Sequence, residues 1–340
     1  MKKSRSRRVI GATVALLPLS LMATALSSPP SGASTSSVSV VGYSVVGPAF
    51  TALETAFKAT PAGQGVTFTN SFGASTTQAE DVVAGQPADV TVFSDVPDLN
   101  LLVASGLVSK SWASYPAAAA EKGFVTDSVV SLIVRPGNPL GITGWNNLTK
   151  SGIQIVTPDP ISSGSARWNL LAAYESQIQQ KKSATTAKNF VNSFVANVVS
   201  EPSSGSKALT TFLSGTGNVL LDYEADAMAA QAAGEKIQIV NPAQNTLIQN
   251  PAALTTSGTS NPAAVAFFDY MFSQAGQTIW VHEGFRATLK AVAAEKKTIF
   301  YQPSRLATVA SLGGWGKVTA KFFSTTGIVT LIENAHGYTS

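Results

Sequence analysis

After residue 37, short runs of β-branched and aromatic residues alternate with longer stretches whose apolar positions repeat every three or four residues. The runs 38–41, 66–69 and 89–94 predict strands, and the stretches 48–60 and 98–107 predict helices. A strand–helix–strand order of this kind favours a parallel sheet covered by helices. The first part of the chain is therefore predicted to be α/β.

The same alternation starts again further along the chain. Strands are predicted at 128–134, 153–156 and 219–222, and helices at 167–180 and 187–199. Two α/β units of similar size predict two lobes, each a mostly parallel sheet flanked by helices. Because ligands of such sheets gather beyond the carboxyl ends of the strands, we expect a binding site in the cleft between the lobes.

The predicted strands also suggest how the chain divides between the lobes. Residues 38–130, together with about 243–300, are assigned to a first lobe, and residues 131–242 to a second lobe. The C-terminal segment 301–340 is expected to pack back across the lobes. The strands that cross between the lobes are expected near 128–134 and 237–242.

The N-terminus differs from the rest of the chain. Five basic residues occupy the first eight positions, an apolar run follows at 9–26, and small residues come after it. This order is typical of a secretory signal peptide, assigned here to 1–33 and followed by a short linker at 34–37. An uncleaved membrane anchor is the alternative, because the run approaches spanning length. The protein is expected to be exported, to a periplasm or the cell exterior, and without any cysteine it is not expected to be a lipoprotein.

The charge of the chain is unevenly distributed. The pI is near 9.2, but five of the 23 basic residues lie in the first eight positions and no acid precedes Glu54. The rest of the chain carries 18 basic and 19 acidic residues, so its net charge does not favour a nucleic-acid partner. Hydrophobic residues make up 44% of the chain, which is enough to build a large core.

Most catalytic and metal-binding patterns are missing from the sequence. With two histidines and no cysteine, no ordinary zinc site is expected, and no cofactor is predicted. One enzyme-like pattern is present, because Ser204-x-x-Lys207 matches the first motif of Ser/Lys acylases. Its partner motif is in the wrong order, since Lys150-Ser151-Gly152 precedes it. We therefore expect a binding protein and not an enzyme, with a Ser/Lys hydrolase and a surface or adhesion module as the alternatives of other classes.

Four short turns rich in serine and glycine each follow a predicted strand and precede a predicted helix. They are Gly42-Tyr43-Ser44, Ser71-Phe72-Gly73-Ala74-Ser75, Ser162-Ser163-Gly164-Ser165 and Ser203-Ser204-Gly205-Ser206. Unpaired N–H groups at a helix start carry partial positive charge and attract anions. Four such turns in one cleft would hold an anion without a charged partner. The alternative is that each turn only caps its own helix, and Ser75 with Gln78 has the pattern of a capping box.

One of these turns lies in a longer signature. The stretch Thr157-Pro158-Asp159-Pro160-Ile161-Ser162-Ser163-Gly164-Ser165-Ala166-Arg167-Trp168-Asn169 resembles the motif T-P-x-P-x-S-S-G-G-A-R-W-N of bacterial periplasmic sulfate- and thiosulfate-binding proteins. Looser similarity extends from about residue 38 to residue 332. The resemblance implies a two-lobed type II periplasmic-binding-protein fold. It also implies a solute-binding component of an ABC importer, whose permease would be a partner; we expect the protein itself to be a monomer.

The same resemblance implies which residues hold the anion. Ser163 would supply a hydroxyl donor, and Tyr223 would stand where the family has a tryptophan indole. The backbone N–H donors would be those of Ser44, Ser75, Gly164, Ser165 and Gly205. Arg167 is expected to form an ion pair near the start of its helix rather than to contact the anion.

Two departures from the family pattern leave the choice of anion open. Ser44 stands where the family has an aspartate, and both Ser44 and Tyr223 are similar to positions in molybdate- and tungstate-binding proteins. Sulfate carries no proton at neutral pH and suits a site made only of donors, whereas phosphate keeps a proton that needs an acceptor. We expect sulfate or thiosulfate as the ligand, with molybdate or tungstate as the alternative and no metal ion in the site.

Overall fold

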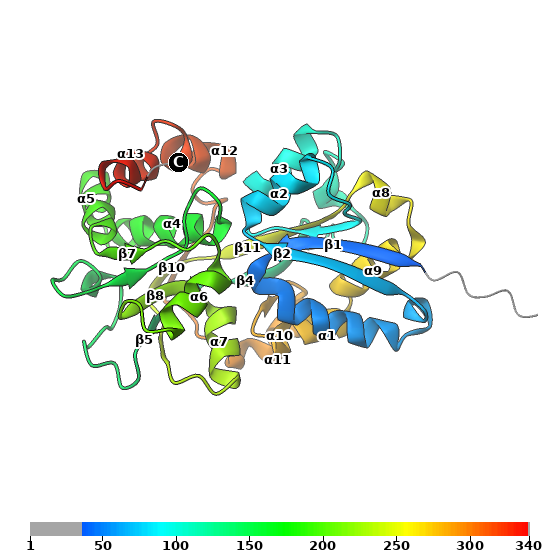
Figure 1. Ribbon diagram of the computed structural model, residues 1–340, viewed down its shortest axis with the longest axis horizontal. Coiled ribbons are helices and arrows are strands. Elements are labelled where there is room, and N and C mark those ends of the chain that lie inside the picture. The colour runs from blue at the N-terminus through cyan, green and yellow to red at the C-terminus, as the bar shows by residue number, and fades with distance from the viewer. Residues whose placement is uncertain (1–35, 339–340) are drawn as a thin grey trace, which may run out of the picture. The chain divides into compact units, whose positions relative to one another are not determined.

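Two large β-sheets, each with helices packed on it, and a further two-stranded sheet make up the described part of the chain (Figure 1). The computed structural model describes residues 36–338, which belong to one compact unit. The predicted signal peptide at 1–33 and part of the predicted linker at 34–37 lie outside the described residues. Ser37, the last residue of that linker, already belongs to the first strand.

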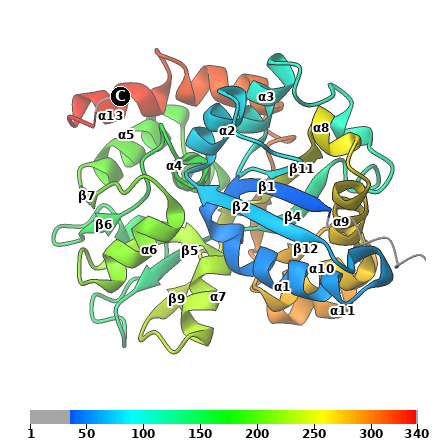
Figure 2. The same ribbon diagram turned by 45° about the vertical axis from the view of Figure 1, so that its right-hand side comes forward.

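The first lobe contains a six-stranded sheet in the order β12-β4-β11-β3-β1-β2. Its strands are β1 (Ser37–Tyr43), β2 (Thr67–Gly73), β3 (Val90–Val92), β4 (Phe124–Ser128), β11 (Ile248–Leu254) and β12 (Arg286–Ala287). Its helices are α1 (Gly47–Lys58), α2 (Ser75–Val83), α3 (Val96–Ala104), α8 (Thr256–Thr259), α9 (Pro262–Phe272), α10 (Gln274–His282) and α11 (Lys290–Lys296). Figure 2 shows α2 and α3 on one side of this sheet and α1 and α10 on the other.

The second lobe contains a five-stranded sheet in the order β7-β6-β8-β5-β9. Its strands are β5 (Val130–Val134), β6 (Ile155–Val156), β7 (Val198–Ser200), β8 (Val219–Tyr223) and β9 (Gln238–Val240). Its helices are α4 (Gly164–Gln179), α5 (Ala184–Val195), α6 (Gly205–Leu213) and α7 (Glu224–Ala232). The helix α4 is buried at fourteen of its 16 residues, so it passes through the lobe instead of lying on its surface.

The prediction of mostly parallel sheets is wrong, because both sheets are mixed. β1 runs parallel to β2 and β3, and β6 runs parallel to β7 and β8, as the strand–helix–strand order predicts. However, β11 runs antiparallel to β3 and β4, and β5 runs antiparallel to β8 and β9. These strands adjoin the extended connections between the lobes, without the helical crossover that keeps neighbouring strands parallel.

The chain passes between the two sheets three times. The first passage leads from β4 directly into β5 through Val129, within the predicted range 128–134. The second leads from β9 through β10 (Gln244–Thr246) to β11. It lies just beyond the predicted range 237–242, because the apolar residues of that range form the edge strand β9 of the second lobe. The third runs from β12 back to β13 (Arg305–Ala307), which pairs with β10.

After this third passage the C-terminal segment packs on the second lobe. It contains α12 (Trp315–Val318) and α13 (Ile328–Ala335). Trp315 meets Trp168 of α4 with ring centroids 4.9 Å apart, and Phe322 meets Tyr174 of the same helix at 4.8 Å. The Tyr338 hydroxyl donates to the backbone oxygen of Val198 at 2.8 Å. The segment thus covers α4 and the edge of the second sheet.

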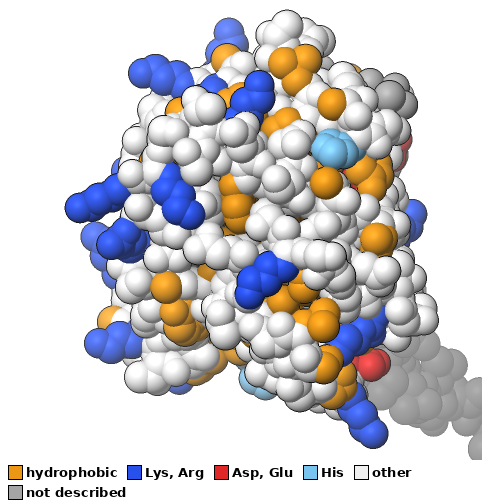
Figure 3. Space-filling view, turned by 90° about the vertical axis from the view of Figure 1, so that its left-hand side faces the viewer, with side chains coloured by type: hydrophobic (Ala, Val, Ile, Leu, Met, Phe, Trp, Pro, Cys, Tyr) orange, Lys and Arg blue, Asp and Glu red, His pale blue; other side chains and the backbone are white. Residues whose placement is uncertain are grey.

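The outer face of the second lobe carries many basic side chains (Figure 3). Lys and Arg are spread over this face among uncharged polar side chains, and apolar side chains appear in separate small groups. Among residues 36–338, no helix has the length and hydropathy needed to cross a membrane.

Candidate functional site

The four serine- and glycine-rich turns meet where the two lobes face each other. The Thr76 N–H of the first lobe donates to the backbone oxygen of Ser162 in the second lobe at 3.0 Å. Across the same junction, the Ser206 N–H donates to the Ser44 hydroxyl at 3.3 Å. Turns that are far apart in the sequence are therefore brought to one place.

The turn 162–165 begins α4 and leaves its serine hydroxyl free of any capping role. Ser163 is the N-cap residue and is 2% exposed, but its side chain makes no capping hydrogen bond. Gly164 and Ser165 are the first two residues of the helix, so their N–H groups have no acceptor within it. The glycine is required by packing, because a Cβ atom at Gly164 would lie 2.6 Å from the Oγ of Ser94 in the opposite lobe.

The turn 203–206 begins α6 and is capped in the ordinary way. Ser204 is the N-cap, and its hydroxyl accepts a hydrogen bond from the Lys207 N–H at 3.3 Å. Gly205 is the first helical residue and lies close to the other turn. A Cβ atom there would be 3.3 Å from the Oγ of Ser165 and 3.0 Å from Oδ1 of Asp222. The starts of α4 and α6 therefore border the same small volume.

On the first lobe, Ser75 does not act as predicted. The N-cap of α2 is Ala74, and Ser75 is the first helical residue, so the predicted capping box with Gln78 is wrong. The Ser75 hydroxyl instead accepts a hydrogen bond from the Ser94 N–H at 2.9 Å, at the end of β3. A serine one position inside the helix points away from the N3 amide, and the neighbouring strand end supplies the donor. Its own N–H remains unused by the helix.

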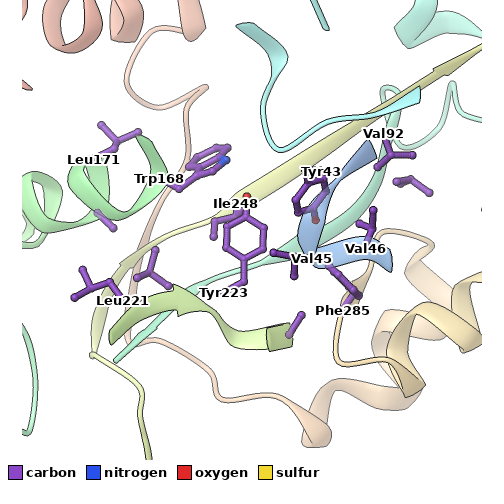
Figure 4. Close-up of a cluster of buried hydrophobic side chains, with 14 of the residues drawn as sticks. Tyr43, Val45, Val46, Val92, Trp168, Leu171, Leu221, Tyr223, Ile248 and Phe285 are labelled. Carbon is purple, nitrogen blue, oxygen red and sulfur yellow. The ribbon is translucent and has the colours of Figure 1, made fainter. Parts of the chain in front are cut away.

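Tyr223 ends β8 and lies fully buried between the lobes (Figure 4). Its hydroxyl is 2.7 Å from the Oγ of Ser94 and accepts a hydrogen bond from the Asn250 amide at 3.4 Å. Its ring packs edge-on against Tyr43 at 5.7 Å between centroids. Burial raises the pKa of Tyr223 well above its usual range, so the side chain is a neutral phenol with one proton to donate.

A buried ion pair joins the lobes beside these turns. Arg167 of α4 contacts Oδ2 of Asp95 at 2.7 Å and Oδ1 of Asp98 at 2.5 Å, both from the first lobe. Burial alone would lower the pKa of Arg167, but the two carboxylates raise it well above its usual range. Burial raises the pKa of Asp95 to about 7, and Arg167 opposes that shift. The expected ion pair of Arg167 is confirmed, and its charge is neutralised within the protein.

Trp168, the next residue along α4, also reaches the first lobe. Its indole N–H donates to the backbone oxygen of Ser94 at 2.9 Å. Asn250 of β11 donates to the same oxygen at 2.9 Å. The end of β3 is thus held from two sides.

Comparison with known proteins identifies the family. Residues 38–286 match the family model of bacterial extracellular solute-binding proteins. The chain belongs to this family. Its fold is the two-lobed α/β fold of type II periplasmic-binding proteins, as the signature predicts.

Individual relatives of this solute-binding protein bind inorganic oxyanions according to their names. A sulfate-binding protein from Synechococcus elongatus is 33% identical over 306 residues, covering 88% of this chain and 87% of the relative. The structure of the sulfate-binding protein SubI from Mycobacterium tuberculosis matches with a TM-score of 0.81 and 40% identity, covering 85% of this chain and 100% of that one. The molybdate-binding protein ModA from Mycobacterium bovis is 26% identical over 283 residues, covering 81% of this chain and 96% of the relative.

The geometry of the solute-binding protein does not assemble the predicted pair of Ser204 and Lys207. The Lys207 ammonium donates to the hydroxyl of Ser203 at 3.0 Å, in an exposed position. The hydroxyl of Ser204 caps α6 by accepting from the Lys207 backbone N–H, and the bond of the ammonium group goes to Ser203 instead. A nucleophile needs a base within hydrogen-bond reach, and this pair does not supply one.

Several residues around the site were not predicted from the sequence. Ser94, Asn250 and Asp222 all lie within the junction, yet none belongs to a serine- and glycine-rich turn. Ser94 and Asp222 stand at or near the carboxyl ends of strands, where ligands of α/β sheets gather, and this position is the only signal that could have found them. Asn250 is on a strand that adjoins a passage between the lobes, and its sequence gives no such signal.

The assembled groups are mostly neutral hydrogen-bond donors in a buried setting. Helix starts, serine hydroxyls and a phenol surround the junction, and the nearby guanidinium is already paired. Such a set can replace the water around an anion without a counter-charge. Within residues 36–338, no group of three or more His, Asp or Glu side chains is placed to hold a metal ion.

Proposed function

We propose that this solute-binding protein captures sulfate between its lobes and delivers it to an ABC importer. The observation that carries the proposal is the buried Ser163 hydroxyl, which stands at the start of α4 without a capping bond. A serine hydroxyl that makes no capping bond at a helix start can donate to a ligand instead, and a hydrogen bond to an anion would use this donor. The names of the sulfate-binding relatives support the same ligand.

The proposed donors come from both lobes. Ser163 donates through its hydroxyl, and Tyr223 donates its phenolic proton when an anion is present. The backbone N–H donors are those of Ser44, Ser75, Gly164, Ser165 and Gly205. Closure of the lobes excludes water and strengthens each of these hydrogen bonds. The role is binding and not catalysis.

Molybdate is the second candidate, because Tyr223 replaces the indole of the sulfate pattern. A molybdate-binding protein is among the relatives, although at lower identity. Molybdate has the same charge as sulfate and the same need for donors, so the two ions differ here in size alone.

The export route and partners follow from the same proposal. The segment 1–33 would direct the protein out of the cytoplasm, and the permease of the importer would be its partner. The protein would work as a monomer, because each chain carries donors from both lobes.

Calorimetric titration of the purified protein with sulfate, molybdate and phosphate tests the proposal. We expect sulfate to bind most tightly, and Ser163→Ala to weaken it by about 1–3 kcal/mol, the scale for a lost hydrogen bond to a charged group. Ser203→Ala serves as the matched control, because Ser203 lies at the first position of the other turn and its hydroxyl accepts from the exposed Lys207. Tighter binding of molybdate would support the second candidate, and the absence of binding to all three ions would contradict the proposed function.

A further inference from the structure

Two buried carboxyl groups lie directly beneath the start of α6. Asp222 is fully buried in β8, and Asp226 of α7 is 7% exposed. Oδ1 of Asp222 accepts a hydrogen bond from the Tyr223 N–H at 2.8 Å and lies 3.0 Å from the position a Cβ would take at Gly205. A carboxyl group therefore borders Gly205, whose N–H is one of the proposed backbone donors.

The remaining oxygens of this pair have no donor. Oδ2 of Asp222 and Oδ2 of Asp226 are both buried without a hydrogen-bond partner among the described residues. The two carboxyl groups are within hydrogen-bonding reach of each other. Two ionised carboxylates only accept, so they can bond to each other only if one of them carries a proton.

The surroundings provide no positive charge for the pair. In the part of the chain from 36 to 338, neither Asp222 nor Asp226 forms an ion pair. From β1, the buried Tyr43 faces both carboxyl groups. On the solvent side, Asp226 lines a cavity of about 640 Å³ between α6, α7 and the first lobe, and the titratable groups that share this cavity are Glu235, His282 and Glu283.

The other charged groups on neighbouring elements already have partners of their own. Glu224, at the start of α7, is paired with Arg286 at 2.8 Å. Lys207 of α6 is exposed and bonds to Ser203. Burial raises the pKa of Asp222 well above its usual range and raises that of Asp226 to about 7, in agreement with one shared proton.

We infer that the Asp222–Asp226 pair holds one proton and thereby selects a fully ionised oxyanion over a protonated one. When the proton is on Asp222, the carboxyl group beside Gly205 is neutral and places no negative charge next to the dianion. Without it, the Asp222 carboxylate would repel sulfate and would accept a hydrogen bond from an oxyanion that keeps a proton, such as hydrogen phosphate. Asp226 would then set selectivity without touching the ligand. This inference rests on the proposed function and names a residue that controls its specificity.

The experiment compares Asp226→Asn and Asp222→Asn with the unmodified protein by calorimetry with sulfate and phosphate. In Asp226→Asn, an uncharged amide donor faces Asp222 and favours its ionised form. We expect the ratio of sulfate to phosphate affinity at pH 7 to fall by about tenfold or more, since an unpaired buried charge then faces the dianion. In Asp222→Asn, the side chain in contact with Gly205 can no longer ionise, so the fall of sulfate affinity at alkaline pH should be lost.

In the unmodified protein, the proton shared by Asp222 and Asp226 should be detectable from the pH dependence of sulfate binding. As pH rises through the pKa of Asp222, which burial raises well above its usual range, we expect sulfate affinity to fall and binding to take up a fraction of a proton, measured from the dependence of the binding heat on the buffer. Asp127→Asn is the matched control, because burial raises the pKa of Asp127 to about 7 as well, yet it lies in β4 and touches none of the proposed donors.

Two outcomes would overturn the inference while leaving sulfate capture intact. One is an Asp226→Asn protein that keeps the sulfate preference of the unmodified protein. The other, which needs no variant at that position, is a sulfate affinity that falls at alkaline pH without any uptake of a proton on binding. An unmodified protein that binds no sulfate at any pH would overturn the proposed function and this inference together.

Discussion

Two copies of the tetrapeptide Ser-Ser-Gly-Ser begin two helices of the second lobe, and the structure uses them differently. In the copy at 203–206 the second serine caps its own helix, with its hydroxyl on the Lys207 N–H. In the copy at 162–165 the second serine makes no capping bond and stays buried at the junction. The same four residues therefore give a structural cap in one place and an available donor in the other.

The residues beyond each tetrapeptide account for part of this difference. Arg167 lies two residues after the first copy and joins the lobes through Asp95 and Asp98. Lys207 directly follows the second copy and is exposed. A guanidinium held by two carboxylates anchors α4 against the first lobe, whereas an exposed ammonium leaves α6 without such an anchor. The comparison shows that a helix start becomes a binding element when its surroundings hold it at an interface.

The largest effect is expected from Arg167→Ala, which removes the anchor of the first copy. Two carboxyl groups would be left buried without their partner, which costs about 3–5 kcal/mol in comparable cases. Chemical unfolding should show this loss, and sulfate binding should weaken because the lobes no longer close over the ion. Lys207→Ala is the matched control and should change stability by less than about 0.5 kcal/mol. Equal effects of the two substitutions would remove the distinction between the copies.

A smaller loss of sulfate affinity is expected when a methyl group is added at each of the two glycines, Gly164 and Gly205. A Cβ at Gly164 would lie 2.6 Å from both Cβ and Oγ of Ser94, so Gly164→Ala forces the lobes apart locally. Such overpacking costs about 1–3 kcal/mol. At Gly205 the closest approach is 3.0 Å, to the Asp222 carboxyl, so Gly205→Ala should cost less. Titration with sulfate measures both, and a larger loss in Gly205→Ala would reverse the predicted order.

Ser204→Ala should lower the free energy of unfolding more than it lowers the affinity for sulfate. Its hydroxyl caps α6, and loss of an N-cap costs about 1 kcal/mol of unfolding free energy. Sulfate affinity should fall much less than it does in Ser163→Ala, where the helix keeps its stability. If the two variants weaken sulfate binding equally, both hydroxyls are donors and the copies are equivalent.

A dependence of stability on pH is expected from the carboxyl cluster behind the two copies. Glu201 precedes the second copy and meets Glu333 of α13 beside a cavity of about 490 Å³ that Asp159 also lines. Burial and the neighbouring carboxyl groups raise the pKa of Glu201 to about 9, and burial raises that of Glu333 to about 7.

The sign of the pH dependence follows from these shifts. Unfolded carboxyl groups lose their protons near pH 4.3, so above that pH the folded state binds more protons than the unfolded state. The unfolding free energy should therefore fall as pH rises from about 5 to 9. Glu333→Gln should flatten this decline, as measured by thermal unfolding across the pH range. A steeper decline in the variant would contradict the assignment.

Much of the fold and part of the candidate site could be predicted from local patterns. The parallel pairing of β1 with β2 and β3 follows from strand–helix–strand order, and the turns before α4 and α6 follow from their serine and glycine content. The antiparallel strands could not be predicted, because their direction depends on how the chain passes between the lobes.

By itself, the sequence determined which segments form strands and helices and which turns carry exposed N–H groups, because these properties depend on residues close together in the chain. It also contained the signature that identifies the family. Only the tertiary structure decided that Ser163 makes no capping bond while Ser204 is a cap, that Asp95 and Asp98 hold Arg167 from about 70 residues away, and that Asp222 meets Gly205. The physical reason is that hydrogen bonds, desolvation and proton sharing depend on distance in space, and the two lobes bring together groups that no local pattern connects.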